Sequence, residues 1–220
     1  GTSTFTSASV FAALGAAADL SKILGKAEHE TTYRTAAEEV RGAILSQLWD
    51  EKTGVFANMQ LVSGEHDRTI DISSVYGAFS FGVLAVDDSK LARAFEKSVA
   101  ALSRGMVSGG IARFEDDDYY RITDTAPGNP WIVTTLWYAE YLTAIAKTDH
   151  DLDRVRDIFA WLEKHAQHSG ALSEQLDPRT GEQVGATPLS WSHAAFVLTV
   201  LAYLGKAQQL NSVQSRHGNA

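Results

Sequence analysis

A glutamate near the C-terminal end of the sequence stands where it could activate water. Glu174 lies in the glycine-containing segment GALSEQLDPRTGEQ (170–183), and Trp191 follows at the start of an apolar run. A capping or surface role is the commonest one for a glutamate in such a loop. A carboxylate beside an aromatic ring at the mouth of a buried helix could instead polarise a water molecule. Glu174 is therefore our candidate general base.

A second loop combines acids, aromatic residues and an arginine. Residues 108–131 contain Arg113, four consecutive acids at 115–118, then Tyr119 and, at the end, Trp131. An acidic run is most often a solvated surface or an adventitious cation site. Aromatic rings stack on the C–H face of a pyranose, however, and arginine and carboxylate side chains bind pairs of sugar hydroxyls. This combination therefore favours a carbohydrate-binding site.

Other catalytic chemistries have little support in the sequence. The chain has no cysteine, which excludes disulfides, thiolate catalysis and cysteine-based zinc sites. His193 lies on an apolar helix, where a histidine is more often a hydrogen-bonded core residue than a catalytic one. No arrangement of serine, histidine and acid has triad or metal-ligand spacing. We therefore expect no metal among the site residues and no cofactor; whether the acids at 115–118 bind calcium or only a sugar stays open.

The overall composition excludes further classes of partner. The net charge is −8, and the lysines and arginines are dispersed, so we expect no nucleic acid. No apolar run reaches the roughly 18 to 20 residues that span a bilayer, and we expect no membrane segment. The start of the chain lacks the charged and apolar regions of a signal peptide. A cytoplasmic and a secreted location both remain open.

Apolar residues recur at helical spacing almost throughout the chain. Seven helices are predicted, around residues 10–24, 33–44, 72–83, 91–102, 129–146, 152–162 and 187–205. The fourth and sixth have a polar face and should lie at a surface.

Two of the seven segments are apolar nearly all round. Residues 129–146 and 187–205 have this pattern, which is typical of buried helices. Each opens with a capping residue and a proline, Asn129-Pro130 and Thr187-Pro188, so we expect helix starts there.

The connections between these helices alternate between short and long. Residues 50–67, 105–128 and 168–186 form loops of roughly twenty residues, a length typical of functional loops or of loops with small strands. If helix directions alternate, all three loops emerge at one end of the molecule.

Two of the long loops also share a local pattern. WDEKTGVF (49–56) and LDPRTGEQ (176–183) have Asp, Thr and Gly at matching offsets, which predicts Asx-type turns that end at a glycine with positive φ. Together with the alternating connection lengths, this shared turn predicts a repeated helical hairpin. Such hairpins arranged around an axis form an all-α (α/α) toroid.

Three stretches of the sequence resemble a known family. SEQLDPRTGEQVGATPLSWSHAAF, RFEDDDYY followed by GNPW, and the opening GTSTFTSASVFAALGAAA resemble the family 15 glycoside hydrolases, the glucoamylase family, in the same order and spacing. The resemblance covers about residues 1 to 205 and implies an (α/α)6 toroid, here an incomplete barrel of about seven helices. It also implies an inverting, exo-acting α-glucosidase. We expect residues 1–205 to form the C-terminal portion of that catalytic domain and residues 206–220 a polar tail.

The resemblance also assigns roles to individual residues. Glu174 matches the family's general base. Five residues match the positions that bind the sugar: Arg113, Asp117, Tyr119, Trp131 and Trp191. The stretch RITDTAP (121–127) is longer than in some members, so the linkage cleaved, α-1,4, α-1,6 or that of trehalose, stays open.

One half of the expected catalytic pair is missing. Inverting glycosidases use two carboxyl groups about 6.5 to 9.5 Å apart. In the family the general acid lies in a Trp-Glu-Glu segment just upstream of the stretch that resembles residues 1–10, and this sequence contains no Trp-Glu-Glu. We therefore expect the N-terminal half of the same barrel, or another subunit, as a partner. By itself the chain should bind a glucose-containing oligosaccharide weakly and hydrolyse nothing.

Two other functions fit the same residues. A non-catalytic helical toroid could bind a glycan or a protein without cutting it, and Glu174 would then be dispensable. An unrelated toroid enzyme could instead use the acids at 115–118 for its chemistry.

Overall fold

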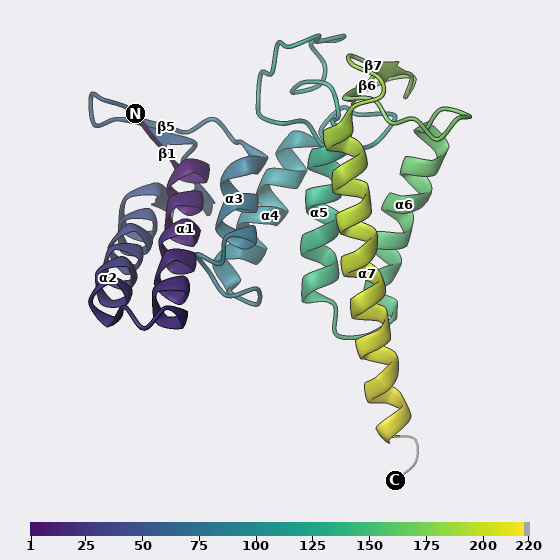
Figure 1. Ribbon diagram of the computed structural model, residues 1–220. Coiled ribbons are helices and arrows are strands. Elements are labelled where there is room, and N and C mark those ends of the chain that lie inside the picture. Colours follow the sequence, from purple (N-terminus) through teal and green to yellow (C-terminus); the bar gives the residue numbers. More distant parts are fainter. Residues whose placement is uncertain (218–220) are drawn as a thin grey trace. The chain divides into compact units, whose positions relative to one another are not determined.

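The computed structural model describes residues 1–217, which are mainly helical (Figure 1). Seven α-helices occur in these residues: α1 (Thr4–Ile23), α2 (Ala27–Ala43), α3 (Ile72–Ser80), α4 (Ser89–Leu102), α5 (Ile132–Ile145), α6 (Asp153–His165) and α7 (Ser190–His217). Each of the seven predicted segments forms one of them, so the predicted all-α class is confirmed. The residues from 206 onward, expected as a polar tail, continue α7 as far as His217; the last three expected tail residues lie outside the described part.

Short strands lie before α1 and in two of the long loops. They are β1 (Thr2–Ser3), β2 (Trp49–Asp50), β3 (Val55–Phe56), β4 (Met59–Gln60), β5 (His66–Asp67), β6 (Gln175–Leu176) and β7 (Gln183–Val184). They pair antiparallel as β1–β4–β5, β2–β3 and β6–β7. Small strands were one of the two expectations for loops of this length.

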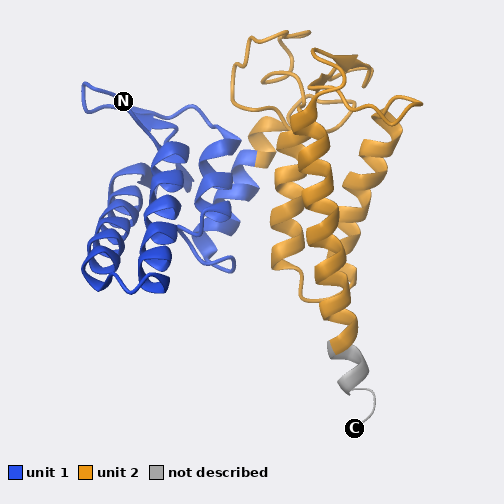
Figure 2. Cartoon of the chain, in the orientation of Figure 1, with its two compact units in different colours: residues 1–98 blue, residues 99–220 orange. Residues whose placement is uncertain are grey.

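The chain divides into two compact units, residues 1–98 and residues 99–220 (Figure 2). In unit 1, α1 packs against both α2 and α3. The backbone of α3 comes close to α1 at Gly77, where an added Cβ would lie 3.0 Å from the Phe5 ring. A side chain at position 77 would therefore push the two helices apart.

In unit 2, α5 is the central helix and packs against both α6 and α7. Ten of its fourteen residues are buried, as its uniformly apolar sequence predicts. The matching prediction for residues 187–205 is wrong for this chain. The face of α7 at Ser192, Ala195 and Thr199 is buried, but a stripe of four large apolar side chains is more than half exposed: Val197, Leu198, Leu201 and Leu204.

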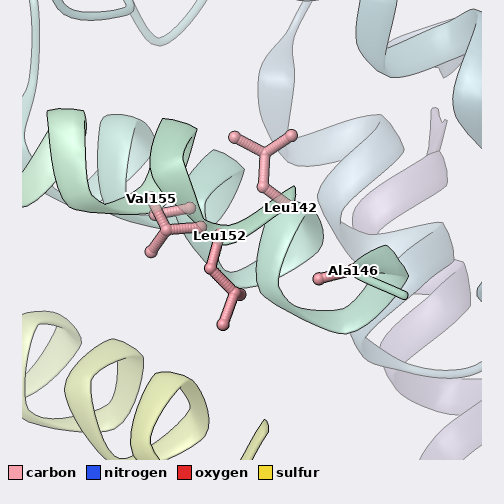
Figure 3. Packing of buried hydrophobic residues seen from close by; sticks show 5 residues of the cluster. Leu142, Ala146, Leu152 and Val155 are labelled. Atoms are coloured by element: carbon pink, nitrogen blue, oxygen red, sulfur yellow. The ribbon is translucent and has the colours of Figure 1, made fainter. Parts of the chain in front are cut away.

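A hydrophobic cluster closes unit 2 at the end away from its long loops. Figure 3 shows Leu142 and Ala146 from the C-terminal end of α5 beside Leu152 and Val155 from the following segment. Leu152 and Val155 have no exposed surface, and burying one such side chain stabilises the fold by about 1.5–3 kcal/mol. This cluster fixes the short turn between α5 and α6.

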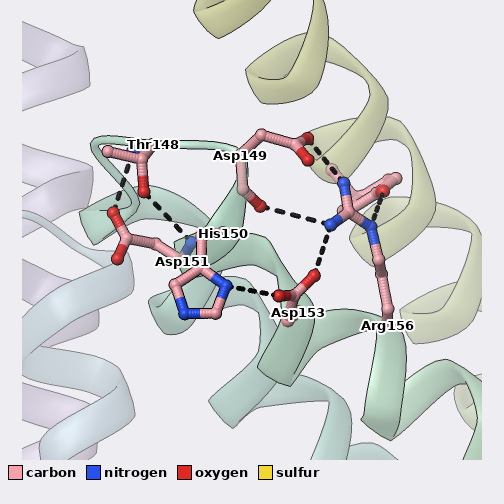
Figure 4. Close-up of polar contacts among 7 residues, drawn as sticks. Thr148, Asp149, His150, Asp151, Asp153 and Arg156 are labelled. Atoms are coloured by element: carbon pink, nitrogen blue, oxygen red, sulfur yellow. Dashed lines mark hydrogen bonds and ion pairs between the residues drawn. The ribbon is translucent and has the colours of Figure 1, made fainter.

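Polar contacts hold the same turn, and Arg156 is their centre (Figure 4). Its guanidinium donates to the carboxylates of Asp149 and Asp153, both at 2.6 Å, and to the main-chain oxygen of Asp149 at 3.2 Å. A further bond reaches the Tyr203 hydroxyl of α7 at 2.8 Å. Arg156 therefore connects the turn, α6 and α7.

Asp151 caps the main chain of this turn. The N–H groups of Lys147 and Thr148 donate to Asp151 Oδ2 at 2.9 and 2.8 Å, and these bonds hold the pKa of Asp151 below its ordinary value. A lowered carboxyl pKa gives stability that is present above about pH 4 and is lost as the pH falls further. This cap is thus intact at neutral pH.

The predicted helix starts are wrong at both capping residues. Helix α5 begins at Ile132 after Trp131, whose side chain makes no capping bond, and α7 begins at Ser190. Asn129 lies three residues before α5, where its side chain bonds to distant segments instead. The Asn129 side-chain amide does not cap α5 because it is used in these tertiary hydrogen bonds.

The predicted Asx turns are present in both units. Asp50 Oδ1 accepts from the N–H of the second and third residues after it, and Gly54, with φ +75°, donates to Asp50 O at 2.8 Å. Asp177 and Gly181, with φ +76°, repeat each of these contacts. The repeat read from the sequence is therefore confirmed at the level of the turn.

No helix within residues 1–217 is both long and apolar enough to cross a bilayer.

Candidate active site

The two long loops of unit 2, residues 103–131 and 166–189, lie at the same end of that unit. They lead into the N-terminal ends of α5 and α7, whereas the α5–α6 turn lies at the opposite end (Figure 1). The third long loop, 50–67, belongs to unit 1. All six predicted site residues belong to unit 2, and four of them lie in its first loop.

Arg113 and Asp117 form a bidentate ion pair. Arg113 Nε donates to Asp117 Oδ2 at 2.7 Å, and Nη2 donates to Oδ1 at 2.8 Å. Only 1% of the Asp117 side chain is exposed, against 30% for Arg113. Asp117 Oδ1 also accepts from the N–H of Tyr119 at 3.2 Å. The carboxylate is thus occupied within the protein and orients the guanidinium, which keeps N–H groups for a ligand.

Aromatic rings surround the Arg113 guanidinium. Its Cζ lies 4.1 Å from the Trp131 ring centroid and 5.3 Å from that of Tyr119, within the range of cation–π attraction. The two rings are 6.2 Å apart and tilted by 32°. Trp131 is buried and Tyr119 is exposed. The buried Trp131 ring therefore packs against the guanidinium, and the Tyr119 ring is the one that is partly open to solvent.

The acidic run does not act as one patch. Asp117 points inward, whereas the flanking acids Asp116 and Asp118 are exposed. Asp116 also has φ +60°, in the left-handed region, which turns the chain between neighbouring acids. Within residues 1–217 no group of three or more histidine or acidic side chains is placed to hold a metal ion.

Glu174 is fixed by its main chain and free at its carboxylate. Its N–H donates to Ala186 O at 3.0 Å, and its carbonyl oxygen accepts from Ile132 N at 3.4 Å. Carboxylate oxygen Oε2 is buried and makes no hydrogen bond to the described residues. Buried acceptors are nearly always paired with protein or water. This oxygen therefore lacks the hydrogen-bond donor that a buried carboxylate normally has.

Gly185 makes room for that carboxylate. Its φ is +77°, and a Cβ added there would lie 2.6 Å from Glu174 Oε2. The turn before α7 thus passes directly over the acid, and only a residue without a side chain leaves the carboxylate where it is.

A hydrogen bond between their neighbours in sequence joins the segments that carry Trp191 and Glu174. Ser192 Oγ donates to Ser173 O at 2.7 Å, so the residue after Trp191 binds the residue before Glu174. Trp191 is 49% exposed and packs edge-to-face on Trp137 of α5, with ring centroids 5.8 Å apart. Trp191 therefore presents its surface near the loop that carries the acid.

The main chain also connects Glu174 to the arginine and its aromatic neighbours. Trp131 forms an isolated antiparallel bridge with Gln175, the residue after Glu174, and another with Ile111, near Arg113. The structure thus joins both predicted parts of the site at one short stretch before α5. Sequence reasoning did not identify Gln175, whose side chain is fully buried.

His193 is a structural residue, as its position on an apolar helix indicated. Its Nε2 accepts a hydrogen bond from the Leu172 N–H at 3.1 Å, which ties α7 to the loop that carries Glu174.

The Asx turn that follows Glu174 in the sequence is stabilised by the ionised carboxylate of Asp177. Burial opposes ionisation of Asp177, but hydrogen bonds from Arg179 and from the main chain of Thr180 outweigh it and hold the Asp177 pKa below its ordinary value. The β6–β7 hairpin therefore keeps this anchor at neutral pH.

Comparison with known proteins finds relatives over most of the chain. Residues 1–201 match the family model described as "Glycosyl hydrolases family 15". An uncharacterized glycosyl hydrolase of Methanocaldococcus jannaschii is 27% identical over 205 residues, which are 89% of this chain and 31% of that protein. A trehalase of Mycolicibacterium smegmatis is 22% identical over 94% of this chain and 29% of its own length.

A solved structure shows the same fold. The crystal structure of a bacterial glucoamylase complexed with acarbose superposes with a TM-score of 0.78 at 21% identity, covering 94% of this chain and 34% of that one. The chain thus spans about a third of the length of each of these three proteins. Its seven helices form part of an (α/α)6 toroid, and the chain belongs to glycoside hydrolase family 15.

Proposed function

We propose that this chain is part of an inverting, exo-acting α-glucosidase of the glucoamylase type, with Glu174 as its general base. The observation that carries the proposal is the buried, unpartnered Oε2 of Glu174 on a loop that the main chain joins to the Arg113 and Trp131 cluster. The substrate we propose is a glucose-containing oligosaccharide, bound at the site formed by Arg113, Asp117, Tyr119, Trp131 and Trp191. Arg113, Tyr119 and Trp191 contact the sugar in this proposal, while buried Asp117 and Trp131 hold the arginine in place.

The chemistry of each group follows from its surroundings. Arg113, oriented by Asp117, donates to sugar hydroxyls, while the exposed rings of Tyr119 and Trp191 pack on apolar sugar faces. Glu174 takes a proton from a water molecule as that water attacks the anomeric carbon. A second carboxyl group protonates the leaving glycosidic oxygen, and the configuration at the anomeric carbon inverts. The linkage stays open because the proteins similar to this chain include both a trehalase and a glucoamylase.

The stereochemistry of the product tests the reaction type. When maltose is added to the protein with its whole catalytic domain, we expect proton NMR to show an early excess of β-glucose over its mutarotation equilibrium, because the non-reducing unit leaves as the β-anomer while the reducing-end unit keeps its own anomeric mixture. An early excess of α-glucose over that equilibrium would contradict the inverting mechanism. Absence of turnover in the whole protein would contradict the assignment as an α-glucosidase.

The second carboxyl group must come from outside this chain in our proposal. The sequence has no Trp-Glu-Glu segment, and the chain spans about a third of its relatives. The exposed α7 stripe adds a structural reason for a partner, and an apolar hollow of about 510 Å³ lies between α6 and α7. We propose that the N-terminal half of the same barrel, or another subunit, covers the stripe and supplies the general acid.

This assembly can be tested with α7 variants. Replacing Leu198 and Leu201 by glutamine should reduce self-association of the isolated chain without lowering its thermal midpoint, because both side chains are already exposed. In the protein with its whole catalytic domain, the same pair should lower the midpoint by several degrees, since buried leucines are lost. Sedimentation and calorimetry measure both effects.

The matched control is Gln208→Glu, an exposed polar position on the same helix, which should change neither quantity. Equal midpoints for the leucine pair and its parent in the whole protein would show that nothing covers the stripe. Turnover of maltose, isomaltose or trehalose by the isolated chain would show that it needs no further acid.

A further inference from the structure

The Asn129 side chain joins the loop that carries Tyr119 to the strand that follows Glu174. Asn129 is 1% exposed. Its Nδ2 donates to Tyr120 O and to Gln175 Oε1, both at 2.8 Å, and its Oδ1 accepts from Ile122 N at 3.1 Å. Both amide hydrogens and the amide oxygen are therefore used, in bonds to two segments far apart in sequence.

The loop segment that Asn129 holds has an unfavourable backbone conformation. Tyr120 has φ +56°, and a residue with a side chain in the left-handed region costs about 1–2 kcal/mol. Asn129 bonds to the carbonyl oxygen of Tyr120 itself and to the N–H of Ile122, two residues further on. These bonds replace the hydrogen bonds that the segment would make in water and so stabilise the turn.

This turn determines where the Tyr119 ring lies. The N–H of Tyr119 is bound by Asp117 on one side, and the carbonyl of the next residue, Tyr120, is bound by Asn129 on the other. The ring therefore stays near the Arg113 guanidinium, with 5.3 Å between Arg113 Cζ and its centroid.

The third bond reaches the other part of the site. Gln175 is fully buried, its main chain pairs with Trp131, and its Oε1 accepts from Asn129. Because Gln175 directly follows Glu174, the Asn129 amide fixes the open tyrosine face and the candidate base relative to each other.

We infer that Asn129 is a positioning residue for substrate binding, acting through Tyr120 and Gln175 rather than by touching the sugar. The inference rests on the proposed function, because it assumes that a sugar binds between Tyr119 and Glu174. If Asn129 has this role, its replacement should weaken substrate binding more than it lowers the rate of the chemical step.

The first experiment measures hydrogen exchange in the chain by itself and needs no turnover. Asn129→Ala should speed exchange of the amides in 118–124, including that of Ile122, by at least about 10-fold, and leave α5 to α7 unchanged. Asn58→Ala is the matched control. Asn58 is a partly buried loop asparagine of unit 1 whose side chain donates to Asp67, and its loss should leave 118–124 unchanged. Faster exchange across all of unit 2 would show a general structural role and overturn the inference.

The second experiment separates KM from kcat in the protein with its whole catalytic domain. Asn129→Ala should raise KM for maltose about 10-fold and change kcat less than about 3-fold. Gln175→Leu removes the acceptor and should raise KM in the same direction. If the two residues act through one bond, the double variant should raise KM by less than the product of the single effects. An unchanged KM in both single variants, or multiplicative effects, would overturn the inference.

Failure of the proposed function has a different signature. If Glu174→Gln keeps full turnover, the assignment of the base fails, whereas the exchange experiment still decides whether Asn129 holds the loop.

Discussion

Glutamine in place of Glu174 should lower kcat at least about 1,000-fold in the protein with its whole catalytic domain. The amide has nearly the same shape, so the main-chain bonds to Ala186 and Ile132 remain, but it cannot take a proton from water. Binding of a neutral, non-hydrolysed analogue such as thio-linked maltose should remain within about 10-fold, because Arg113 and the rings are untouched. Steady-state kinetics and calorimetric titration measure the two effects.

The control is Glu182→Gln, an exposed acid on the same hairpin loop that should behave like the parent. If Glu174→Gln keeps turnover, another acid is the base. If the whole protein binds sugar but has no turnover to lose, the domain is a glycan-binding module instead.

The second large effect is expected at Gly185. Alanine there would bring a Cβ to 2.6 Å from Glu174 Oε2, so the carboxylate or the turn must move. A misplacement of about 1 Å in a catalytic group can lower the rate about 100-fold. We therefore expect Gly185→Ala to lower kcat by about that factor.

Gly170 provides a closely matched control in the same loop. Its φ is +82°, close to the +77° of Gly185, but nothing lies within 4 Å of a Cβ added there. Both alanine variants should lose similar stability, about 1–2 kcal/mol, from the same backbone strain. Only Gly185→Ala should lose turnover beyond that; equal kinetics in the two variants would show that Gly185 does not position the carboxylate.

Features that depend on local sequence could be predicted without coordinates. The Asx turns at Asp50 and Asp177 form because a carboxylate, two main-chain N–H groups and a glycine lie within five residues. The seven helices follow from apolar spacing, and α5 is buried because apolar residues cover its whole circumference.

Features that depend on distant partners could not be predicted in this way. A local rule assigns Asn129 to a helix cap, but three tertiary bonds recruit its side chain. The α7 sequence has the pattern of a buried helix, yet exposure depends on surfaces that this chain does not provide. The closeness of Gly185 to Glu174 depends on how an eleven-residue separation folds back on itself, which no periodicity encodes.

The duplicated turn also allows a comparison within the molecule. Aligning Asp50 with Asp177 places Gln47 where the second copy has Glu174, so unit 1 carries the amide counterpart of the acid ahead of the same hairpin. Only the turn and the hairpin recur, because Gln47 lies in the helical segment Ile44–Leu48 whereas Glu174 lies outside any helix. The same hairpin therefore follows two different kinds of backbone, and what distinguishes Glu174 is the chain packed around it, with Gly185 over its carboxylate.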